Sequence, residues 1–296
     1  MGTATRQLLG LAGAVRRNVA VAAEVCGLPS TASLRVLVYH DVPERQVPEF
    51  AAQLRHLARR WRFISPSEFN AIVLGEESLR DRCLLLTFDD GFISNRLVAE
   101  AVLEPMGIRA IFFVVPGFVD IDERAKARRY VVERIQPGRR ESSLDGGLAN
   151  MDWNDLAVLL ERGHSIGAHT LTHARLSTVA AVSDLEREII GSGEAIAARL
   201  GTSVTHFAYP YGEVSSVTER AISIAAMRYP FVLSGVRGNN RSASSLAIRR
   251  DSVAPLEALG VVDAFLEGLV DVWYAKSRKV LDDWASRAKN ETTDLR

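Results

Sequence analysis

The sequence has few of the features that mark disulfide-stabilised, nucleic-acid-binding or membrane-spanning proteins. Only two of its 296 residues, Cys26 and Cys83, are cysteines, too few for a disulfide framework or a cysteine-only metal cluster. Lysine plus arginine and aspartate plus glutamate are equal at 36 each, so there is no basic excess to neutralise phosphates. No apolar stretch approaches the roughly 20 residues that span a bilayer. We therefore expect no nucleic-acid partner and no integral membrane span.

The composition is instead typical of a globular protein with a sizeable core. Hydrophobic residues make up 47% of the sequence and charged residues 24%. Between residues 34 and 270, apolar runs of strand length alternate with segments of helical periodicity. This order predicts an α/β domain at 34–270 with a parallel barrel, complete or incomplete, of six or seven strand–helix units.

Both ends of the chain are expected to be helical and to lie outside this barrel. Residues 1–33 are predicted to form a helical or peripheral segment, because a short apolar run at 8–15 lies between Arg6 and Arg16. We expect a cytoplasmic or peripherally membrane-associated protein, with export as the alternative, because no convincing cleavage site follows this run. Residues 271–296 are predicted to form a helical tail. The expected buried face of the helical region 256–288 consists of Phe265, Leu269, Val272, Trp273 and Leu281.

Residues 120–150 interrupt the alternation of strands and helices. Basic residues crowd there, together with three glycines. We predict an inserted, mobile surface loop, which is either simply solvated or serves as a lid or cationic rim for an anionic polymer. The basic residues are Arg124, Lys126, Arg128, Arg129, Arg134, Arg139 and Arg140.

Four polar clusters follow directly after predicted strands. In parallel barrels the working residues project from the carboxyl ends of the strands, where the loops converge. This coincidence predicts a catalytic site at that end of the barrel. The clusters are residues 39–41 (Tyr-His-Asp), 87–91 (Thr-Phe-Asp-Asp-Gly), 169–173 (His-Thr-Leu-Thr-His) and 209–212 (Tyr-Pro-Tyr-Gly).

Two of these clusters together favour a metal site. His169 and His173 are four residues apart, so on a helical turn their rings share one face. Two imidazoles and one carboxylate form a recurrent ligand set for a divalent ion such as Zn²⁺. Asp89 and Asp90 are both candidates for the carboxylate, and the other one would remain free as a base. Either cluster alone is also explained by a packed histidine pair or a turn.

The clusters at 87–91, 169–173 and 209–212 closely resemble the motifs of the polysaccharide deacetylases. The resemblance implies a distorted (β/α)7 barrel and removal of acetyl groups from an acetylated glycan. It implies that Asp90, His169 and His173 bind a divalent metal, with Zn²⁺ expected and Co²⁺, Mn²⁺ or Ni²⁺ as alternatives. Asp89 is then the catalytic base. It also assigns Tyr209, Pro210 and Tyr211 to the substrate and oxyanion site, with the Tyr211 N–H as the donor.

The sequence departs from the commonest family pattern at two positions. Residues 207–209 (Phe-Ala-Tyr) lack the arginine that many members carry there, and the late run 246–251 lacks a histidine. The early Tyr-His pair resembles that of a subgroup, which predicts His40 as the general acid.

The late run itself offers a replacement for the missing arginine. Arg250 shares a strand face with Leu246 and Ile248, so we expect it to restrain Asp89, with a surface salt bridge as the alternative. His56 is expected to be exposed.

Three functions are compatible with these residues. The first is a metal-dependent hydrolase that removes N-acetyl groups from an amino-sugar polymer. The second keeps the site and changes the substrate, giving an O-acetyl esterase or a small-amide hydrolase. The third is a catalytically silent glycan-binding protein that retains the barrel.

Overall fold

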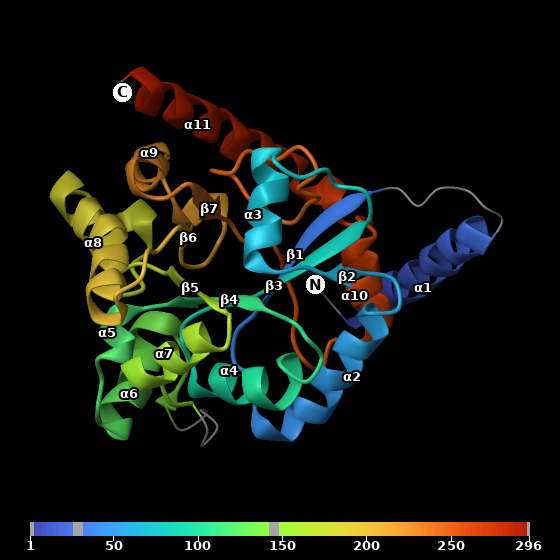
Figure 1. The fold of residues 1–296 in the computed structure, drawn as a ribbon, viewed down its shortest axis with the longest axis horizontal. Coiled ribbons are helices and arrows are strands. Elements are labelled where there is room, and N and C mark those ends of the chain that lie inside the picture. The colour runs from blue at the N-terminus through green and yellow to red at the C-terminus, as the bar shows by residue number, and fades with distance from the viewer. Residues whose placement is uncertain (1–2, 26–31, 142–147, 295–296) are drawn as a thin grey trace.

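The computed structural model describes residues 3–25, 32–141 and 148–294. Its centre is one parallel sheet that curls into an open barrel, with helices packed around it (Figure 1). The spatial order of the strands is β7-β6-β5-β4-β3-β1-β8, and β2 pairs with β3 beside this path. The expected α/β fold with a distorted parallel barrel is therefore confirmed. The strands are β1 (Ser33–Tyr39), β2 (Arg62–Phe63), β3 (Arg82–Phe88), β4 (Ala110–Val114), β5 (Ser165–Ala168), β6 (His206–Ala208), β7 (Phe231–Leu233) and β8 (Asp251–Ser252).

Helices connect the strands and extend the chain at both ends. Within the described residues, no helix combines the length and apolar character needed to cross a membrane. The helices are α1 (Thr3–Val25), α2 (Val47–Leu57), α3 (Pro66–Leu74), α4 (Ile93–Val98), α5 (Pro116–Val119), α6 (Arg124–Tyr130), α7 (Trp153–Glu161), α8 (Val182–Leu200), α9 (Glu219–Arg228), α10 (Leu259–Leu266) and α11 (Ala275–Asp294).

The long strands β1 and β3 are buried on both faces, which explains their continuous apolar sequences. Alternate side chains therefore belong to two separate apolar clusters. Leu84 and Leu86 join the large cluster shared with the surrounding helices. Leu85 joins a smaller cluster made mainly of strand residues, among them Ile248. Because side chains alternate along a strand, Thr87 and Asp89 continue the face of Leu85.

The two edges of the sheet are linked through residues 248–252. Ile248 forms a bridge with Leu233 of β7, and Asp251 pairs with Leu37 of β1. Arg250 lies between these two contacts and continues the face of Ile248. The segment that joins the edges thus directs Arg250 toward the same side of the sheet as Asp89.

The segment 120–150 is helical over much of its described part. It contains α6 and a π turn at Val131–Ile135, while residues 142–147 lie outside the described residues. The segment predicted as a surface loop is therefore partly helical.

The expected buried face of the C-terminal region is wrong at two positions. Val272 and Trp273 are 70% and 59% exposed, whereas Phe265 and Leu281 are buried as expected. The helical periodicity does not continue through this region, because α10 ends at Leu266 and residues 271–274 form a separate 3₁₀ turn.

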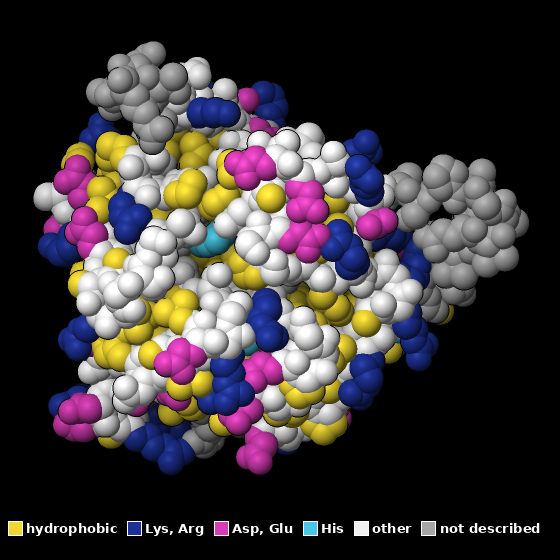
Figure 2. Space-filling model, in the orientation of Figure 1, with side chains coloured by type: hydrophobic (Ala, Val, Ile, Leu, Met, Phe, Trp, Pro, Cys, Tyr) yellow, Lys and Arg dark blue, Asp and Glu magenta, His cyan; other side chains and the backbone are white. Residues whose placement is uncertain are grey.

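Charges of both signs are interspersed over the face of the molecule that Figure 2 displays. This distribution matches the equal numbers of basic and acidic residues in the sequence.

Candidate active site

The carboxyl ends of β1, β3, β5 and β6 carry the residues that the sequence singles out, and we call this end the barrel mouth. Asp89 and Asp90 follow β3, and His169 directly follows β5. Together with His173 they are almost completely buried, with exposed fractions of 2–5%. Four buried titratable side chains in one place are unusual unless they are paired or bind an ion.

Asp90, His169 and His173 form a group that fits a metal ion. Each offers one ligand atom, and these atoms all lie within 4.8 Å of one another. Asp90 Oδ1 is 3.4 Å from His173 Nε2 and 3.6 Å from His169 Nε2. In a tetrahedral site with bonds of about 2.0–2.1 Å, neighbouring ligand atoms lie about 3.3–3.4 Å apart. The spacing therefore suits an ion of the size of Zn²⁺.

The second nitrogen of each histidine ring is engaged by the backbone. His169 Nδ1 lies 2.6 Å from the carbonyl oxygen of Ala208, and His173 Nδ1 lies 2.8 Å from that of Arg134. A proton on Nδ1 donates to these carbonyls and leaves the lone pair of Nε2 directed at the shared centre. Burial also lowers the pKa of His169 to about 4, so this ring is neutral at neutral pH, as a ligand must be.

The loop that carries the two histidines is not the helical turn that their spacing predicts. Residues 169–175 have no helical hydrogen bonding, and Thr170 and His173 have positive φ angles of 59° and 61°. Asp90 likewise has a φ of 78°. Non-glycine residues rarely adopt this left-handed region, and where they do, the surrounding structure must compensate. Two of the three candidate ligands thus sit on strained backbone.

Glu188 of α8 provides part of this compensation. The hydroxyl and backbone N–H of Thr172 both donate to its carboxylate, at 2.8 and 2.9 Å, and Leu171 N–H donates to its carbonyl. Glu188 is 5% exposed, so these contacts are shielded from water. Neither Glu188 nor Arg134 was predicted to support the histidines, because neither belongs to a cluster at the end of a strand.

Asp89 is bound by Arg250, while His169 Nε2 lies 3.9 Å from Asp89 Oδ2. The guanidinium donates to both carboxylate oxygens at 2.7 and 2.8 Å, and its Nε–H donates to the Ser234 carbonyl. Arg250 is 2% exposed, so this bidentate pair is not a surface salt bridge. Burial alone would raise the pKa of Asp89, but the charge of Arg250 holds it below its usual value.

The pKa of Asp90 is also low. Burial would raise it, but the hydrogen bond with His173 lowers it to about 2. Both carboxylates are therefore ionised at neutral pH.

His40 and Tyr211 flank the buried group. His40 is exposed at the end of β1, where Asn95 Nδ2 donates to its carbonyl at 2.6 Å. The Tyr211 ring lies 5.1 Å from the His173 ring and stacks against the guanidinium of Arg175, and its φ of 65° turns the backbone sharply. Tyr209 and Pro210 precede it and are buried.

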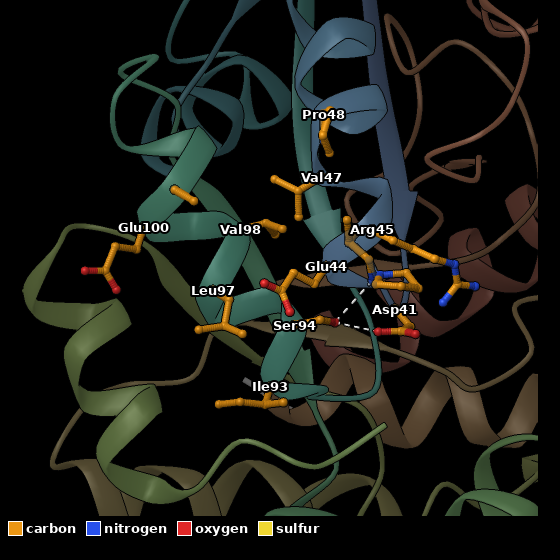
Figure 3. A pocket seen from close by; sticks show the side chains of 13 residues that line it. Asp41, Glu44, Arg45, Val47, Pro48, Ile93, Ser94, Leu97, Val98 and Glu100 are labelled. Atoms are coloured by element: carbon orange, nitrogen blue, oxygen red, sulfur yellow. Dashed lines mark hydrogen bonds between the residues drawn. The ribbon is translucent and has the colours of Figure 1, made fainter. Parts of the chain in front are cut away.

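Cavities adjoin the barrel mouth on several sides. A cavity of about 600 Å³ has His173, Tyr211 and Arg175 in its wall. A groove of about 930 Å³ lies between α2 and α4 and begins at Asp41, whose carboxylate accepts a hydrogen bond from Ser94 (Figure 3). Most of the residues that line this groove are apolar, and none of them is a candidate metal ligand.

Comparisons with known proteins agree with this geometry. The curated protein YxkH of Bacillus subtilis (strain 168) is 21% identical over 244 residues, covering 80% of this chain and 77% of YxkH. The structure of IcaB from Ammonifex degensii is similar, with 25% identity, a TM-score of 0.63 and coverage of 80% of this chain and 98% of that one. The deacetylase PplD of Streptococcus pyogenes, solved in complex with acetate, has 20% identity and a TM-score of 0.62, covering 80% and 99%. The polysaccharide deacetylase family model matches residues 76–230. This chain therefore belongs to the polysaccharide deacetylase family.

Proposed function

We propose that the protein is a metal-dependent hydrolase that removes N-acetyl groups from an amino-sugar polysaccharide or oligosaccharide. The observation that carries this proposal is a candidate ligand group of one carboxylate and two imidazoles next to a second, separately held carboxylate. Hydrolysis of an unreactive amide needs both a Lewis acid and a base, and this arrangement can supply both.

Asp90, His169 and His173 would hold the divalent cation. Such a cation polarises the acetyl carbonyl and makes a water molecule more acidic. The ligand set favours Zn²⁺, with Co²⁺, Mn²⁺ and Ni²⁺ as alternatives.

The remaining residues would move protons and stabilise charge. Asp89 accepts the proton of the attacking water, and Arg250 keeps its carboxylate ionised and correctly oriented. The N–H of Tyr211 donates to the developing oxyanion. His40 protonates the departing amine, which leaves poorly without a proton.

The test is acetate release from N-acetylglucosamine oligomers by the metal-analysed protein, with acetylated xylan as the comparison substrate. We expect acetate from the oligomers, loss of release with a chelator, and recovery on adding Zn²⁺. Release from xylan alone would replace the proposal with an O-acetyl esterase. Glycan binding without any acetate release, at full metal occupancy, would replace it with a silent binding protein.

A further inference from the structure

Exposed apolar side chains are concentrated at one place on the molecule. Most of the large hydrophobic side chains that are exposed within the described residues belong to α1 or to residues 256–273. Those in this group are Leu8, Leu11, Val15, Leu256, Leu259, Val272 and Trp273, whereas Leu74, Leu97, Val182 and Met227 are scattered elsewhere. A concentration of this kind marks an interaction surface.

Helix α1 is attached to the body by its glycine face. The backbones of α1 and α10 approach so closely that a Cβ on Gly13 would lie 2.1 Å from the carbonyl oxygen of Gly260. Arg6 also forms an ion pair with Glu257 at 3.1 Å. Figure 1 shows α1 at the periphery of the molecule, next to α10. The glycines therefore determine which side of α1 packs against α10.

The opposite side of α1 is apolar and exposed. At about 100° per residue, Leu8, Leu11 and Val15 share one side of the helix, across from Gly10 and Gly13. The three side chains are 68%, 67% and 62% exposed. An apolar stripe on the solvent side of a helix that is already packed has no role in the core of this chain.

The surroundings of this stripe are basic. Arg16 lies one residue beyond Val15 and lines a cavity of about 400 Å³ with Arg35, Arg82 and Arg241. Arg35 and Arg82 are paired with carboxylates, but within the described part of the chain neither Arg16 nor Arg241 forms an ion pair. The stripe is thus flanked by positive charge that an anionic partner would neutralise.

Trp273 extends the apolar surface beyond α1. It lines a small cavity together with Arg6, so it lies beside the start of α1. Tryptophan is enriched at membrane–water interfaces, where an apolar ring with one polar N–H is favoured.

We propose that α1 and residues 256–273 form a docking surface for an anionic phospholipid bilayer. Leu8, Leu11, Val15 and Trp273 enter the interface, while Arg16 and Arg241 contact the lipid phosphates. The combination of an apolar stripe and flanking cations matches the two components of a bilayer surface. A second copy of this chain would bring the same arginines together and repel.

The docking surface adjoins the barrel mouth. Arg6 and His40 line one cavity of about 330 Å³, so the start of α1 stands next to the proposed general acid. Docking would therefore hold the mouth close to the lipid surface, where a membrane-proximal glycan is presented. This last step depends on the proposed function, whereas docking itself does not.

The experiment measures sedimentation of the full chain with vesicles. Vesicles of equal parts phosphatidylglycerol and phosphatidylcholine are compared with pure phosphatidylcholine at low and high salt. We expect binding to the anionic vesicles that weakens with salt. Leu8→Asp with Leu11→Asp should reduce the partition coefficient at least about tenfold, and Arg16→Glu about fivefold or more.

Helix α9 offers matched controls on another side of the molecule (Figure 1). Met227→Asp replaces an apolar side chain that is also exposed, at 53%, and Arg220→Glu makes the same change of charge as Arg16→Glu. Both should bind vesicles like the unmodified protein. Addition of anionic vesicles should also shift the tryptophan emission to shorter wavelength, and Trp273→Phe should remove that shift.

Three outcomes would overturn the proposal. One is absence of binding to anionic vesicles by protein whose circular dichroism shows it folded. Another is equal loss of binding in the α9 control variants. The third is a doubled mass in light scattering that Leu8→Asp with Leu11→Asp abolishes without any effect of lipid, since this would identify a second copy as the occupant. Acetate release from soluble oligomers is measured in parallel, so a failure of the proposed function is recognised separately.

Discussion

The barrel mouth buries charged side chains, whereas the docking surface formed by α1 and residues 256–273 exposes apolar ones. Asp89 and Asp90 are 3% and 2% exposed, while Leu8 and Leu11 are 68% and 67% exposed. Both arrangements oppose the ordinary distribution of polar and apolar groups. At the barrel mouth, the cost of burying the two carboxylates is offset within the chain by Arg250 and the histidines. Within the described residues, no part of the chain covers the apolar side chains of the docking surface. A partner outside the chain must therefore cover them.

The largest expected effect concerns the two neighbouring carboxylates at the mouth. Asp89→Asn should lower kcat about 10³-fold with metal content unchanged, because it removes the base and keeps the ligands. Asp90→Ala should instead reduce metal content. Kinetics and elemental analysis of both variants measure the difference. Full activity of Asp89→Asn would exclude Asp89 as the base.

The next effect is on stability. Arg250→Met leaves the buried carboxylate of Asp89 unpaired and should reduce the free energy of unfolding by about 3–5 kcal/mol. Denaturant titration measures it. The double variant Arg250→Met with Asp89→Leu should recover much of the loss, because no charge then remains unpaired. Equal destabilisation of the single and double variants would show that Arg250 acts through packing alone.

Stability should also fall in mild acid because of two histidines outside the candidate metal group. Burial lowers the pKa of His164 and His206 to about 4, against about 6.5 in an unfolded chain. The unfolded chain therefore binds more protons between these values, and the free energy of unfolding decreases as pH falls from about 6.5 to about 4. The loss is at most about 3.4 kcal/mol per histidine, at about 1.36 kcal/mol per pKa unit.

Denaturant titrations at several pH values across this range measure that decrease. His206→Asn should make the free energy of unfolding less dependent on pH, because the contribution of His206 is removed. An unchanged pH dependence in this variant would contradict the assignment.

His40→Ala should lower kcat about 10²-fold without releasing metal, because His40 is exposed and touches none of the candidate ligands in the described hydrogen bonds. The expectation that His56 is exposed is wrong, because its side chain is only 14% exposed and its Nε2 lies 3.0 Å from Asp263. The exposed Met227 therefore supplies the control variant, Met227→Ala.

The smallest expected effect tests the other half of the comparison. Leu11→Asp should change the free energy of unfolding by less than about 0.5 kcal/mol, because the side chain has little contact to lose. Thermal or denaturant unfolding measures it next to the Arg250 variant. A loss of several kcal/mol would mean that Leu11 is part of the core, and the contrast between the two regions would disappear.

The sequence was sufficient to predict the order of the strands along the chain. It was also sufficient to predict that the polar clusters lie together at the barrel mouth. The alternation of side chains along a strand was enough to predict that Arg250 lies on the same side of the sheet as Asp89. This alternation depends only on neighbouring residues in the sequence. The helical turn at 169–173 was wrong, since positive φ angles at Thr170 and His173 are imposed by contacts such as those of Glu188. Such contacts join residues that are far apart in the chain, and no local pattern encodes them.

Two further features could not be derived from residue identity. The carbonyl of Arg134 binds His173, and a backbone carbonyl looks the same at every position of a sequence. Trp273 was predicted to continue a buried helical face, but the 3₁₀ turn at 271–274 changes the direction in which successive side chains point.

The link between the two edges of the sheet has a consequence for how the protein would lose activity. Residues 248–252 touch both edges of the sheet and carry the guanidinium that holds Asp89. If residues 248–252 detach from the sheet, Asp89 loses its contact with Arg250 while the surrounding helices are still intact. On heating, activity should therefore be lost before the helical signal in circular dichroism. A covalent cross-link that holds residues 248–252 to the sheet would delay the loss of activity.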